Sequence, residues 1–467
     1  MKDSRELQGK QTTSYEGYPQ EVGVELRGNG GVQSNTPASQ SGRNGTHGNE
    51  ECLLERILHR DNLNMAYKRV KSNKGSHGID GMEVNELLPF LKKHGETIRQ
   101  SILEGSYKPK PVRRVEIPKP DGGTRQLGIP TVLDRMIQQA IAQELTKIFD
   151  PGFSEYSYGF RPNKNAHQAI IKARDYIQQG HNWVVDIDLE KFFDRVNHDK
   201  LMSLVSRKVK DKRVLHLIRK YLESGIMLNG IKVKSEEGTP QGGPLSPLLS
   251  NIMLDELDKE LERRGHKFCR YADDCNIYVK SKKAGDRVMA SITQFVEERL
   301  KLKVNRDKSA VDKPIRRKFL GFSFYNVKGE TRNFIHKKPI ERFKAKIREI
   351  TSRSNGKGME WRKIKLNQLI IGWVNYFKIA DMRNLARNLD QWIRRRIRMC
   401  YWKQWKKIKT KHNNLVKLGI KDSKAWEYAN TRKGYWRISG SHILSTSLTN
   451  ERLEKMGFTT LTKRLSM

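Results

Sequence analysis

Apolar residues recur at helical spacing in several segments of the chain. The first segment, residues 52–70, begins with four such residues on one face: Leu53, Leu54, Ile57 and Leu58. In residues 130–149 the shared face consists of Leu133, Met136, Ile137, Ile141, Leu145 and Ile148. A stripe of this kind predicts an amphipathic helix whose apolar face packs against a core.

Shorter β-prone runs lie between the helical segments. Residues 112–130 predict a hairpin with Asp-Gly-Gly as its turn, and residues 183–194 predict a buried strand that runs into a helix. Residues 266–280, HKFCRYADDCNIYVK, predict two short strands joined by a tight turn at ADDC. A further strand is predicted in residues 319–325, FLGFSFY.

The order of these elements predicts the domain organisation. A Gly/Pro-rich loop leads to Ser246 and Pro247, which suit the N-cap and the first turn of a helix. From about residue 340 the pattern is helical and strongly basic. We therefore expect an α+β domain to about residue 330, then an all-helical domain and a short C-terminal extension. Residues 1–50 are polar and aperiodic, and we expect a disordered leader there.

The charge balance indicates a polyanionic partner. Lys and Arg total 91 against 52 Asp and Glu, which gives a formal net charge of +39 and a sequence pI of about 10.0. Residues 1–50 hold five basic and six acidic side chains, so all of the positive excess lies beyond them. Nucleic acid is the usual partner of such a surface, although charge alone is also compatible with a merely soluble basic protein.

The sequence shows no clear targeting signal and no cysteine pattern that indicates a metal site or a disulfide. The strongest apolar run, LIIGWVNYF, has half the length of a membrane span, and the N-terminal residues lack the apolar core of a secretory signal. We expect no membrane partner and a cytoplasmic location. The four cysteines show no metal-ligand spacing; Cys269 and Cys275 flank the ADDC turn, and we expect them to be reduced.

Two acidic clusters carry the candidate chemistry. Asp273 and Asp274 are adjacent in the ADDC turn, and DIDLEKFFD ends a predicted strand near residue 188. Carboxylates brought together at one sheet edge repel one another and raise each other's pKa. Divalent cations remove that penalty, and two Mg²⁺ ions about 4 Å apart serve phosphoryl transfer. Taken alone, however, an Asp-Asp pair in a turn is more often solvated than metal-bound.

Several motifs occur together in order. YADD is preceded by VVDIDLEKFFDRVNH and GTPQGGPLSPLLSNIMLDELD, and the chain also contains RQLGIPTVLDRMIQQA, SYGFRPNKNAHQA, KSAVDKPIRRKFLGFSF and GWVNYF. From about residue 51 to its end, the sequence resembles the reverse transcriptase-maturases encoded by bacterial group II introns. The resemblance implies a right-hand polymerase fold, with fingers and an antiparallel palm sheet in residues 51–335. It also implies a helical thumb or maturase domain in residues 336–425 and a short DNA-binding region in residues 426–467, without an endonuclease domain.

The resemblance also implies roles for individual residues. Asp188, Asp273 and Asp274 match the catalytic carboxylates that hold two Mg²⁺ ions, with Mn²⁺ as an alternative. Asp186 is a rival for the role of Asp188, which we prefer because it precedes the Phe-Phe pair at the family's spacing. Phe193 matches the aromatic residue that excludes a ribonucleotide 2′-hydroxyl, although a core phenylalanine is equally compatible with the sequence.

Other positions match the nucleotide pocket and the nucleic-acid track. Lys119 and Arg125 match phosphate-binding residues, although without the resemblance we would interpret them as solvated charges of the hairpin. Gln241 and Gly242 match the loop that lines the nucleotide and template pocket, and Lys308 is a weaker candidate for the same pocket. Residues 391–412 hold nine Lys or Arg, no acid and three tryptophans, of which we expect at least two of Trp392, Trp402 and Trp405 to be core anchors. The nucleic-acid-binding cations predicted on the outer face are Arg394, Arg395, Arg398, Lys403, Lys406 and Lys407.

The resemblance therefore predicts an RNA-directed DNA polymerase that binds its parent group II intron RNA, assists its splicing and copies it into DNA. Its expected partners are that RNA, a primer–template duplex, target DNA and deoxynucleoside triphosphates; the oligomeric state stays open. The alternatives are a splicing-only maturase with a vestigial polymerase and a domesticated or defence reverse transcriptase.

Overall fold

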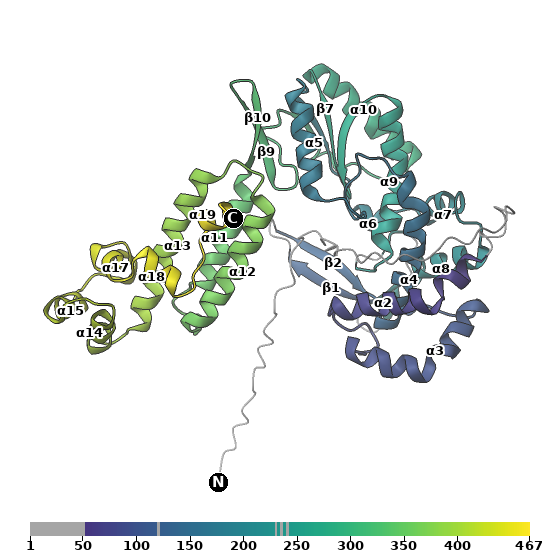
Figure 1. Ribbon diagram of the computed structural model, residues 1–467. Coiled ribbons are helices and arrows are strands. Elements are labelled where there is room, and N and C mark those ends of the chain that lie inside the picture. Colours follow the sequence, from purple (N-terminus) through teal and green to yellow (C-terminus); the bar gives the residue numbers. More distant parts are fainter. Residues whose placement is uncertain (1–51, 119–121, 229–230, 234–236, 240–241) are drawn as a thin grey trace, which may run out of the picture.

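The computed structural model describes residues 52–467 apart from 119–121, 229–230, 234–236 and 240–241 (Figure 1). The predicted disordered leader, residues 1–50, lies outside the described residues. The mixed α+β fold followed by a helical region is confirmed (Figure 1).

The first part of the chain is a helical layer with a small sheet. Its elements are α1 (Leu53–Ile57), α2 (Arg60–Ser72), η1 (Val84–Glu86), α3 (Leu87–Leu103), β1 (Val112–Pro118), β2 (Thr124–Ile129), α4 (Val132–Phe149) and η2 (Asp150–Gly152). The predicted helices at residues 53 and 132 are confirmed, because their apolar stripes are buried or packed against the core. The β1–β2 hairpin is also confirmed, and it joins β4 (Ile226–Leu228) and β5 (Ile231–Val233) in the order β2-β1-β4-β5.

The second part is built around a four-stranded antiparallel sheet of order β6-β7-β3-β8. Its strands are β3 (Trp183–Ile187), β6 (Lys267–Tyr271), β7 (Asp274–Val279) and β8 (Ala310–Asp312). Its helices are α5 (Ala166–Gln178), α6 (Phe192–Arg195), α7 (His198–Ser206), α8 (Lys212–Leu222), α9 (Ser246–Arg263) and α10 (Lys282–Arg299). The sequence placed Ser246 at the N-cap of a helix, but α9 begins at Ser246 and Leu245 is its N-cap; Pro247 does lie in the first turn.

The two faces of this sheet belong to different apolar cores. Because successive side chains of a strand point to opposite faces, Val184 and Val185 enter different clusters. Val185 packs in the cluster that contains α10, whereas Val184 packs in the cluster that contains α5 and the C-terminal helices. Each face is therefore covered by helices.

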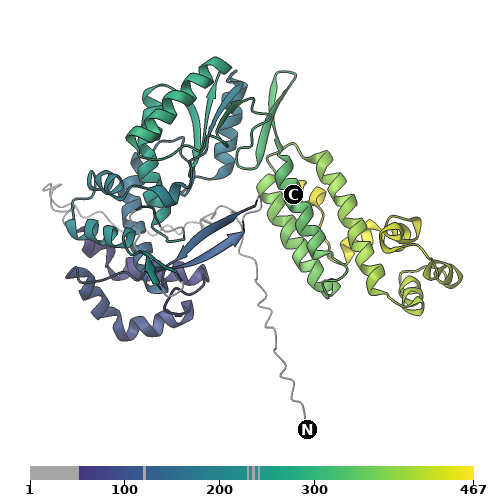
Figure 2. The same ribbon diagram turned by 180° about the vertical axis from the view of Figure 1, so that it is seen from behind.

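The third part is a hairpin followed by helices. It contains β9 (Phe322–Val327), β10 (Glu330–Ile335), α11 (Lys337–Ile350), α12 (Met359–Phe377), α13 (Arg383–Gln404), α14 (Ile408–Lys417), α15 (Asp422–Ala429), α16 (Tyr435–Ser439), α17 (His442–Ser447), α18 (Asn450–Lys455) and α19 (Leu461–Leu465). Seen from both sides, this region forms a lobe beside the rest of the molecule (Figures 1 and 2). Trp402 and Trp405 are buried, as predicted for two of the three tryptophans.

The C-terminal extension packs back onto α13. The Asp390 carboxylate accepts hydrogen bonds from the backbone N–H groups of Leu461 and Thr462, at 2.8 and 3.0 Å. These bonds satisfy two N–H groups at the start of α19, which no earlier turn of that helix can do. The division drawn at residues 425 and 426 falls inside α15, so no break in secondary structure marks that point.

Candidate active site

The strand register brings the two acidic clusters together. In the antiparallel pairing of β3 with β7, Asp186 lies opposite Asn276 and Ile187 lies opposite Cys275. Asp188 directly follows β3 and Asp274 is the first residue of β7, so the same register continued by one residue sets them opposite each other, and the negative charge of Asp188 acts on Asp274. Residues opposite each other in such a ladder have Cα atoms about 4.5–5.5 Å apart and side chains on the same face of the sheet. The sequence therefore folds so that Asp186, Asp188 and Asp274 share one face.

The ADDC turn is the predicted tight hairpin. Tyr271 pairs with Asp274, so only Ala272 and Asp273 form the connection. Ala272 has a φ of +57°, an unfavourable conformation for a residue with a Cβ. Gly159 of the SYGFRP motif lies against this turn, since a Cβ at that position would come 2.3 Å from the Ala272 nitrogen. The SYGFRP segment therefore contacts the turn so closely that only glycine fits.

A buried arginine, Arg270, supports the β6–β7 turn through hydrogen bonds. The Arg270 side chain is fully buried and pairs with Asp258 of α9, donating to both carboxylate oxygens at 2.7 and 2.5 Å. It also donates to the Ala272 carbonyl at 2.8 Å, to the Ser157 hydroxyl at 2.8 Å and to Asn251 Oδ1 at 3.0 Å. Sequence reasoning missed this residue; its only signal was a cation directly before YADD inside a predicted short strand.

The charge of Asp186 is compensated within the protein. Arg317, from the segment after β8, pairs with its carboxylate through Nη2 and Nε, the latter at 2.9 Å. Burial raises the pKa of Asp186, while the Arg317 charge opposes that shift. This pairing occupies the rival carboxylate and so favours Asp188 as the functional one.

Asp274 has a different electrostatic environment. Burial raises its pKa well above the ordinary value, and the negative charges of Asp186 and Asp273 add to the shift. The charge of Lys318 opposes it without overcoming it. The carboxylate of Asp274 is thus held in a cluster with an excess of negative charge, which a bound cation relieves.

Asp188 is placed by its backbone. Its N–H donates to the Ser309 hydroxyl at 3.0 Å, and its carbonyl accepts from the Asn305 N–H at 2.8 Å. The Lys308 ammonium lies 3.8 Å from Asp188 Oδ2. Lys308, the weaker candidate from the sequence, is therefore a neighbour of this carboxylate.

The donor set fits Mg²⁺ in the way that nucleotide-dependent sites use it. In the described part of the chain, no three His, Cys, Asp or Glu side chains gather closely enough to hold a metal ion by themselves. Mg²⁺ is usually bound by one or two carboxylates together with substrate phosphates and water. Neighbouring carboxylates at the ends of the two central strands, among them the buried Asp274 with its raised pKa, meet that requirement.

The other candidates for the nucleotide pocket are only partly described. Phe193 is half-buried, packs against the core and makes an edge contact with Phe192 at 5.2 Å between ring centroids. Gly242 has a φ of +126°, and a Cβ there would lie 2.8 Å from the Gly128 carbonyl oxygen. This position therefore accepts only glycine. Lys119 and Gln241 lie outside the described residues, and the same holds for the side chain of Arg125.

The predicted nucleic-acid-binding cations fall into two groups. Lys406 and Lys407 are exposed, and Arg394 and Lys403 are partly so. Arg395 donates to the Trp436 carbonyl at 3.0 Å and lies 4.0 Å from the centroid of that ring. Arg398 donates to the Leu448 carbonyl at 2.8 Å and to Asn450 at 3.1 Å. Arg395 and Arg398 thus also attach the C-terminal extension to α13.

Comparison with known proteins gives the family. Residues 117–324 match the reverse transcriptase (RNA-dependent DNA polymerase) family, and residues 340–419 match the group II intron, maturase-specific domain. Protein YkfC of Escherichia coli is 34% identical over 299 residues, which cover 56% of this chain and 78% of YkfC. The chain belongs to the group II intron reverse transcriptase/maturase family.

Longer relatives share only part of their length with this chain. Group II intron-encoded protein LtrA of Lactococcus lactis is 38% identical over 219 residues, which cover 47% of this chain but 36% of LtrA. A telomerase structure from Candida albicans aligns with a TM-score of 0.40 at 12% identity, over 73% of this chain and 68% of that one. Among the described residues, no helix has both the length and the apolar character needed to cross a membrane.

Proposed function

We propose that this reverse transcriptase copies its parent group II intron RNA into DNA and also assists the splicing of that RNA. The observation that carries the polymerase half is that Asp188 directly follows β3 and Asp274 begins the paired strand β7, so that the charge of Asp188 acts on Asp274, with Asp273 in the adjoining turn. The raised pKa of Asp274 supports it, because the local excess of negative charge is what a divalent cation relieves.

The reaction is the attack of a primer 3′-hydroxyl on the α-phosphorus of a deoxynucleoside triphosphate, with pyrophosphate leaving. Asp188, Asp273 and Asp274 would hold two Mg²⁺ ions, which supply a more acidic hydroxyl and charge stabilisation on the leaving oxygens. The protein's own part is alignment: the β6–β7 turn and its Arg270 support fix the carboxylates before substrate arrives. Asp186, already paired with Arg317, stays outside this set.

The remaining pocket residues have supporting roles. Phe193, half-buried and in edge contact with Phe192, would contact the sugar of the incoming nucleotide and leave no room for a 2′-hydroxyl. Gly242 allows backbone to approach the ligand. Lys119, Arg125 and Gln241 would contact the triphosphate and the template, and Lys308 would help through its position beside Asp188.

The helical region carries the RNA half of the proposal. Its match to the maturase-specific domain and its basic surface support binding of intron RNA, the primer–template duplex and target DNA. We assign residues 51–335 to fingers and palm, 336–425 to the thumb or maturase domain and 426–467 to a DNA-binding region. The high positive charge fits work in the bacterial cytoplasm, beside nucleic acid.

Two experiments test the proposal. Purified protein is given an RNA template, a DNA primer, deoxynucleotides and Mg²⁺, and extension of the primer is measured; no extension under any divalent cation would refute the polymerase half. RNA crosslinked to the protein in cells is then sequenced. We expect enrichment of transcripts that span the flanks of the gene itself, and recovery of unrelated transcripts alone would refute the maturase half.

A further inference from the structure

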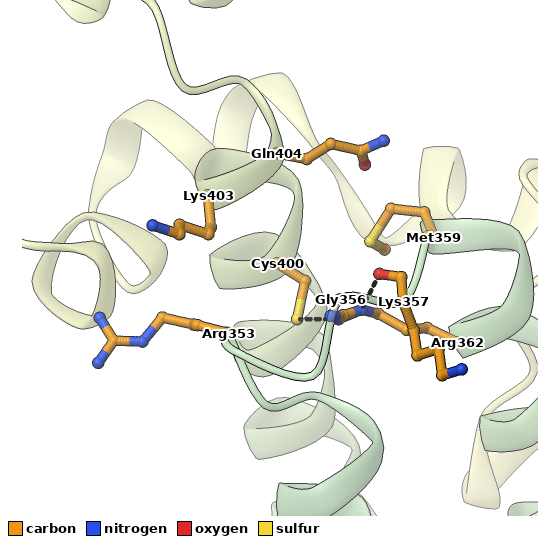
Figure 3. Close-up of a pocket in the computed structure, with 9 residues that line it drawn as sticks. Arg353, Gly356, Lys357, Met359, Arg362, Cys400, Lys403 and Gln404 are labelled. Carbon is orange, nitrogen blue, oxygen red and sulfur yellow. Dashed lines mark hydrogen bonds between the residues drawn. The ribbon is translucent and has the colours of Figure 1, made fainter. Parts of the chain in front are cut away.

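A cavity of about 280 Å³ lies in the helical region, between the loop that precedes α12 and the C-terminal half of α13 (Figure 3). Four cations line it: Arg353, Lys357, Arg362 and Lys403. The other lining residues are neutral. Among the described residues, every charged side chain that lines this cavity is therefore a cation. Its volume is close to the roughly 300 Å³ at which small-molecule sites begin.

Arg362 differs from the other three cations because its side chain is buried. It is 5% exposed, and its guanidinium donates to the Ser352 carbonyl at 2.9 Å and to Asn355 Oδ1 at 2.5 Å. It also contacts the Lys357 carbonyl at 3.3 Å and the Cys400 sulfur at 3.8 Å, the two contacts drawn in Figure 3. All four partners are neutral groups.

The charge of Arg362 therefore meets no counter-ion in the part of the chain that the structure describes. Among the described residues, no carboxylate forms an ion pair with it. Burial raises the pKa of the Cys400 thiol, which keeps that neighbour neutral as well. A buried charge that lacks an opposite charge is costly, and an anion in the adjoining cavity would remove that cost.

The backbone at the cavity adds to the same preference. The 19-residue helix α12 begins at Met359, and its N-cap, Gly358, supplies no side chain to cap the first N–H groups. A Cβ at Gly358 would meet no atom within 4 Å, so this backbone is open to a ligand. The partial positive charge of a helix N-terminus then acts together with the four cations.

The outer side of the cavity indicates which kind of anion enters. Arg353 and Lys403 extend to the same side in Figure 3, and both cationic groups lie over the ring of Tyr435, at 5.4 and 5.1 Å from its centroid. An aromatic ring flanked by cations is the arrangement with which proteins hold single-stranded nucleic acid, through stacking and phosphate contacts. A free small anion has no base or sugar that could contact the ring of Tyr435.

We infer that this cavity binds a backbone phosphate of single-stranded RNA or DNA, with Arg353, Arg362 and Lys403 as its charged contacts and Tyr435 beside the adjoining nucleotide. The inference rests on the proposed binding of nucleic acid by the helical region and makes one place of contact specific. The site lies apart from the catalytic carboxylates, so it anchors the strand and takes no part in the chemistry.

The test compares the variant Arg353→Gln/Lys403→Gln with the wild type. Both side chains are at least partly exposed, so the substitution leaves the core intact. The matched control is Lys346→Gln/Lys365→Gln, which removes two exposed charges from α11 and α12 outside the cavity. Thermal unfolding is followed in inorganic phosphate and in chloride at equal ionic strength. Taking differences between proteins cancels the general stabilisation that phosphate gives to any protein.

We expect phosphate to raise the melting temperature of the wild type and the control more than that of the cavity variant. Single-stranded RNA should bind the cavity variant about tenfold more weakly, the loss typical of a charge-assisted contact. The slope of log affinity against log salt concentration should also be shallower by about 0.7 for the cavity variant, which is the value for one phosphate contact on a single strand.

Two results would overturn the inference. Equal responses of all three proteins to phosphate would mean that the cavity is not an anion site. A phosphate response lost in the cavity variant, with RNA affinity and salt dependence equal to the control, would assign the cavity to a free small anion. Neither readout needs polymerisation, so a wild type that fails to extend primers would refute the proposed function while leaving this test intact.

Discussion

The catalytic sheet and the helical region both bury charge, but they compensate it differently. Beneath the β6–β7 turn, the Arg270 charge meets Asp258 at 2.5 Å, and beside it Asp186 meets Arg317. In the helical region, Arg362 is buried to a similar extent and meets only neutral acceptors. The paired charges are structural, whereas the charges left without a partner mark the places where a ligand of opposite sign is expected.

The same contrast holds within the sheet. Asp274 has a raised pKa because burial and three neighbouring acids outweigh one lysine, while Asp186 has an arginine of its own. The buried Asp274 carboxylate, with its raised pKa, indicates a cation at the ends of β3 and β7, and the buried Arg362 guanidinium among neutral partners indicates a phosphate in the helical region. The following predictions test whether this division of charges is functional.

The largest effect is expected for Asp273→Ala. Removing a metal-binding carboxylate forfeits about 4 kcal/mol of transition-state stabilisation, so primer extension should fall about a thousandfold. The melting temperature should stay near that of the wild type, since the side chain is at a turn. Extension on an RNA template measures the loss, with Asp286→Asn, an exposed acid on α10, as the control. Activity within tenfold of the wild type would remove Asp273 from the site.

Breaking a compensated pair should instead cost stability. Arg270→Met leaves Asp258 buried and alone, and we expect the free energy of unfolding to drop by about 3–5 kcal/mol. Urea denaturation measures this drop. The double variant Arg270→Met/Asp258→Leu should recover much of the stability, because it removes both charges.

Polymerase activity separates the two roles of Arg270. The double variant still lacks the donor to the Ala272 carbonyl, so the turn is less well placed and extension should remain reduced. Full activity together with full stability in the double variant would show that Arg270 only neutralises Asp258.

A neutral contact in the same site should have a smaller and more selective effect. Phe193→Ala opens space beside the sugar, so discrimination against ribonucleotides should weaken by roughly 10- to 100-fold. The ratio of kcat/KM for a deoxynucleotide and its ribonucleotide counterpart measures this change. Phe192→Leu serves as the control, because Phe192 is a core residue that contacts Phe193. An unchanged ratio in Phe193→Ala would leave Phe193 as a core residue only.

The smallest effect is expected at the boundary between the two regions. His336 caps α11 by accepting from the Lys338 N–H at 3.3 Å, and burial, followed by the charges of Lys318 and Lys338, lowers its pKa. A lowered pKa in the folded state gives stability that is present above the unfolded value of 6.5 and is lost as the pH falls through the folded value. The protonated ring can no longer accept the capping bond.

The variant His336→Asn keeps a cap that does not titrate. Between pH 7.5 and pH 5 its unfolding free energy should fall less than that of the wild type, by at most about 1 kcal/mol, the usual contribution of an N-cap. Chemical denaturation at several pH values measures the difference. Parallel curves for the two proteins would mean that His336 makes no contribution to the pH dependence.

Much of the sheet and its turn followed from the sequence, because those features depend on local pattern. The two β-prone runs in residues 266–280 predict the β6–β7 hairpin, which the structure confirms, although the turn is shorter than the predicted ADDC because Asp274 and Cys275 belong to β7. The apolar stripe of α4 likewise follows from spacing, and the burial of Trp402 and Trp405 agrees with the expectation that at least two of the three tryptophans are core anchors. The start of α9 was misplaced by one residue, since turn chemistry alone does not fix the first hydrogen-bonded residue.

The supporting contacts could not be predicted, because they join distant parts of the chain. Arg270 and Asp258 lie 12 residues apart on different elements, and Arg317 is 131 residues from Asp186. No local pattern indicates which of 91 cations meets which acid, or that Arg362 meets none. Such pairings depend on three-dimensional packing, which periodicity does not determine.

The apolar core that unites α5, the β3–β7 face and the C-terminal helices has a consequence for modularity. Val184 and Tyr278 belong to the same apolar cluster as Phe343 and Leu461. The His167 ring is hydrogen-bonded to the Tyr376 carbonyl at 2.7 Å. A fragment cut after residue 335 would keep α5 on this face of the sheet but would expose the apolar side chains of β9 and β10 that pack against the C-terminal helices. The copying half of the chain is therefore not a detachable unit, and its excision should yield an aggregating product in place of a minimal enzyme.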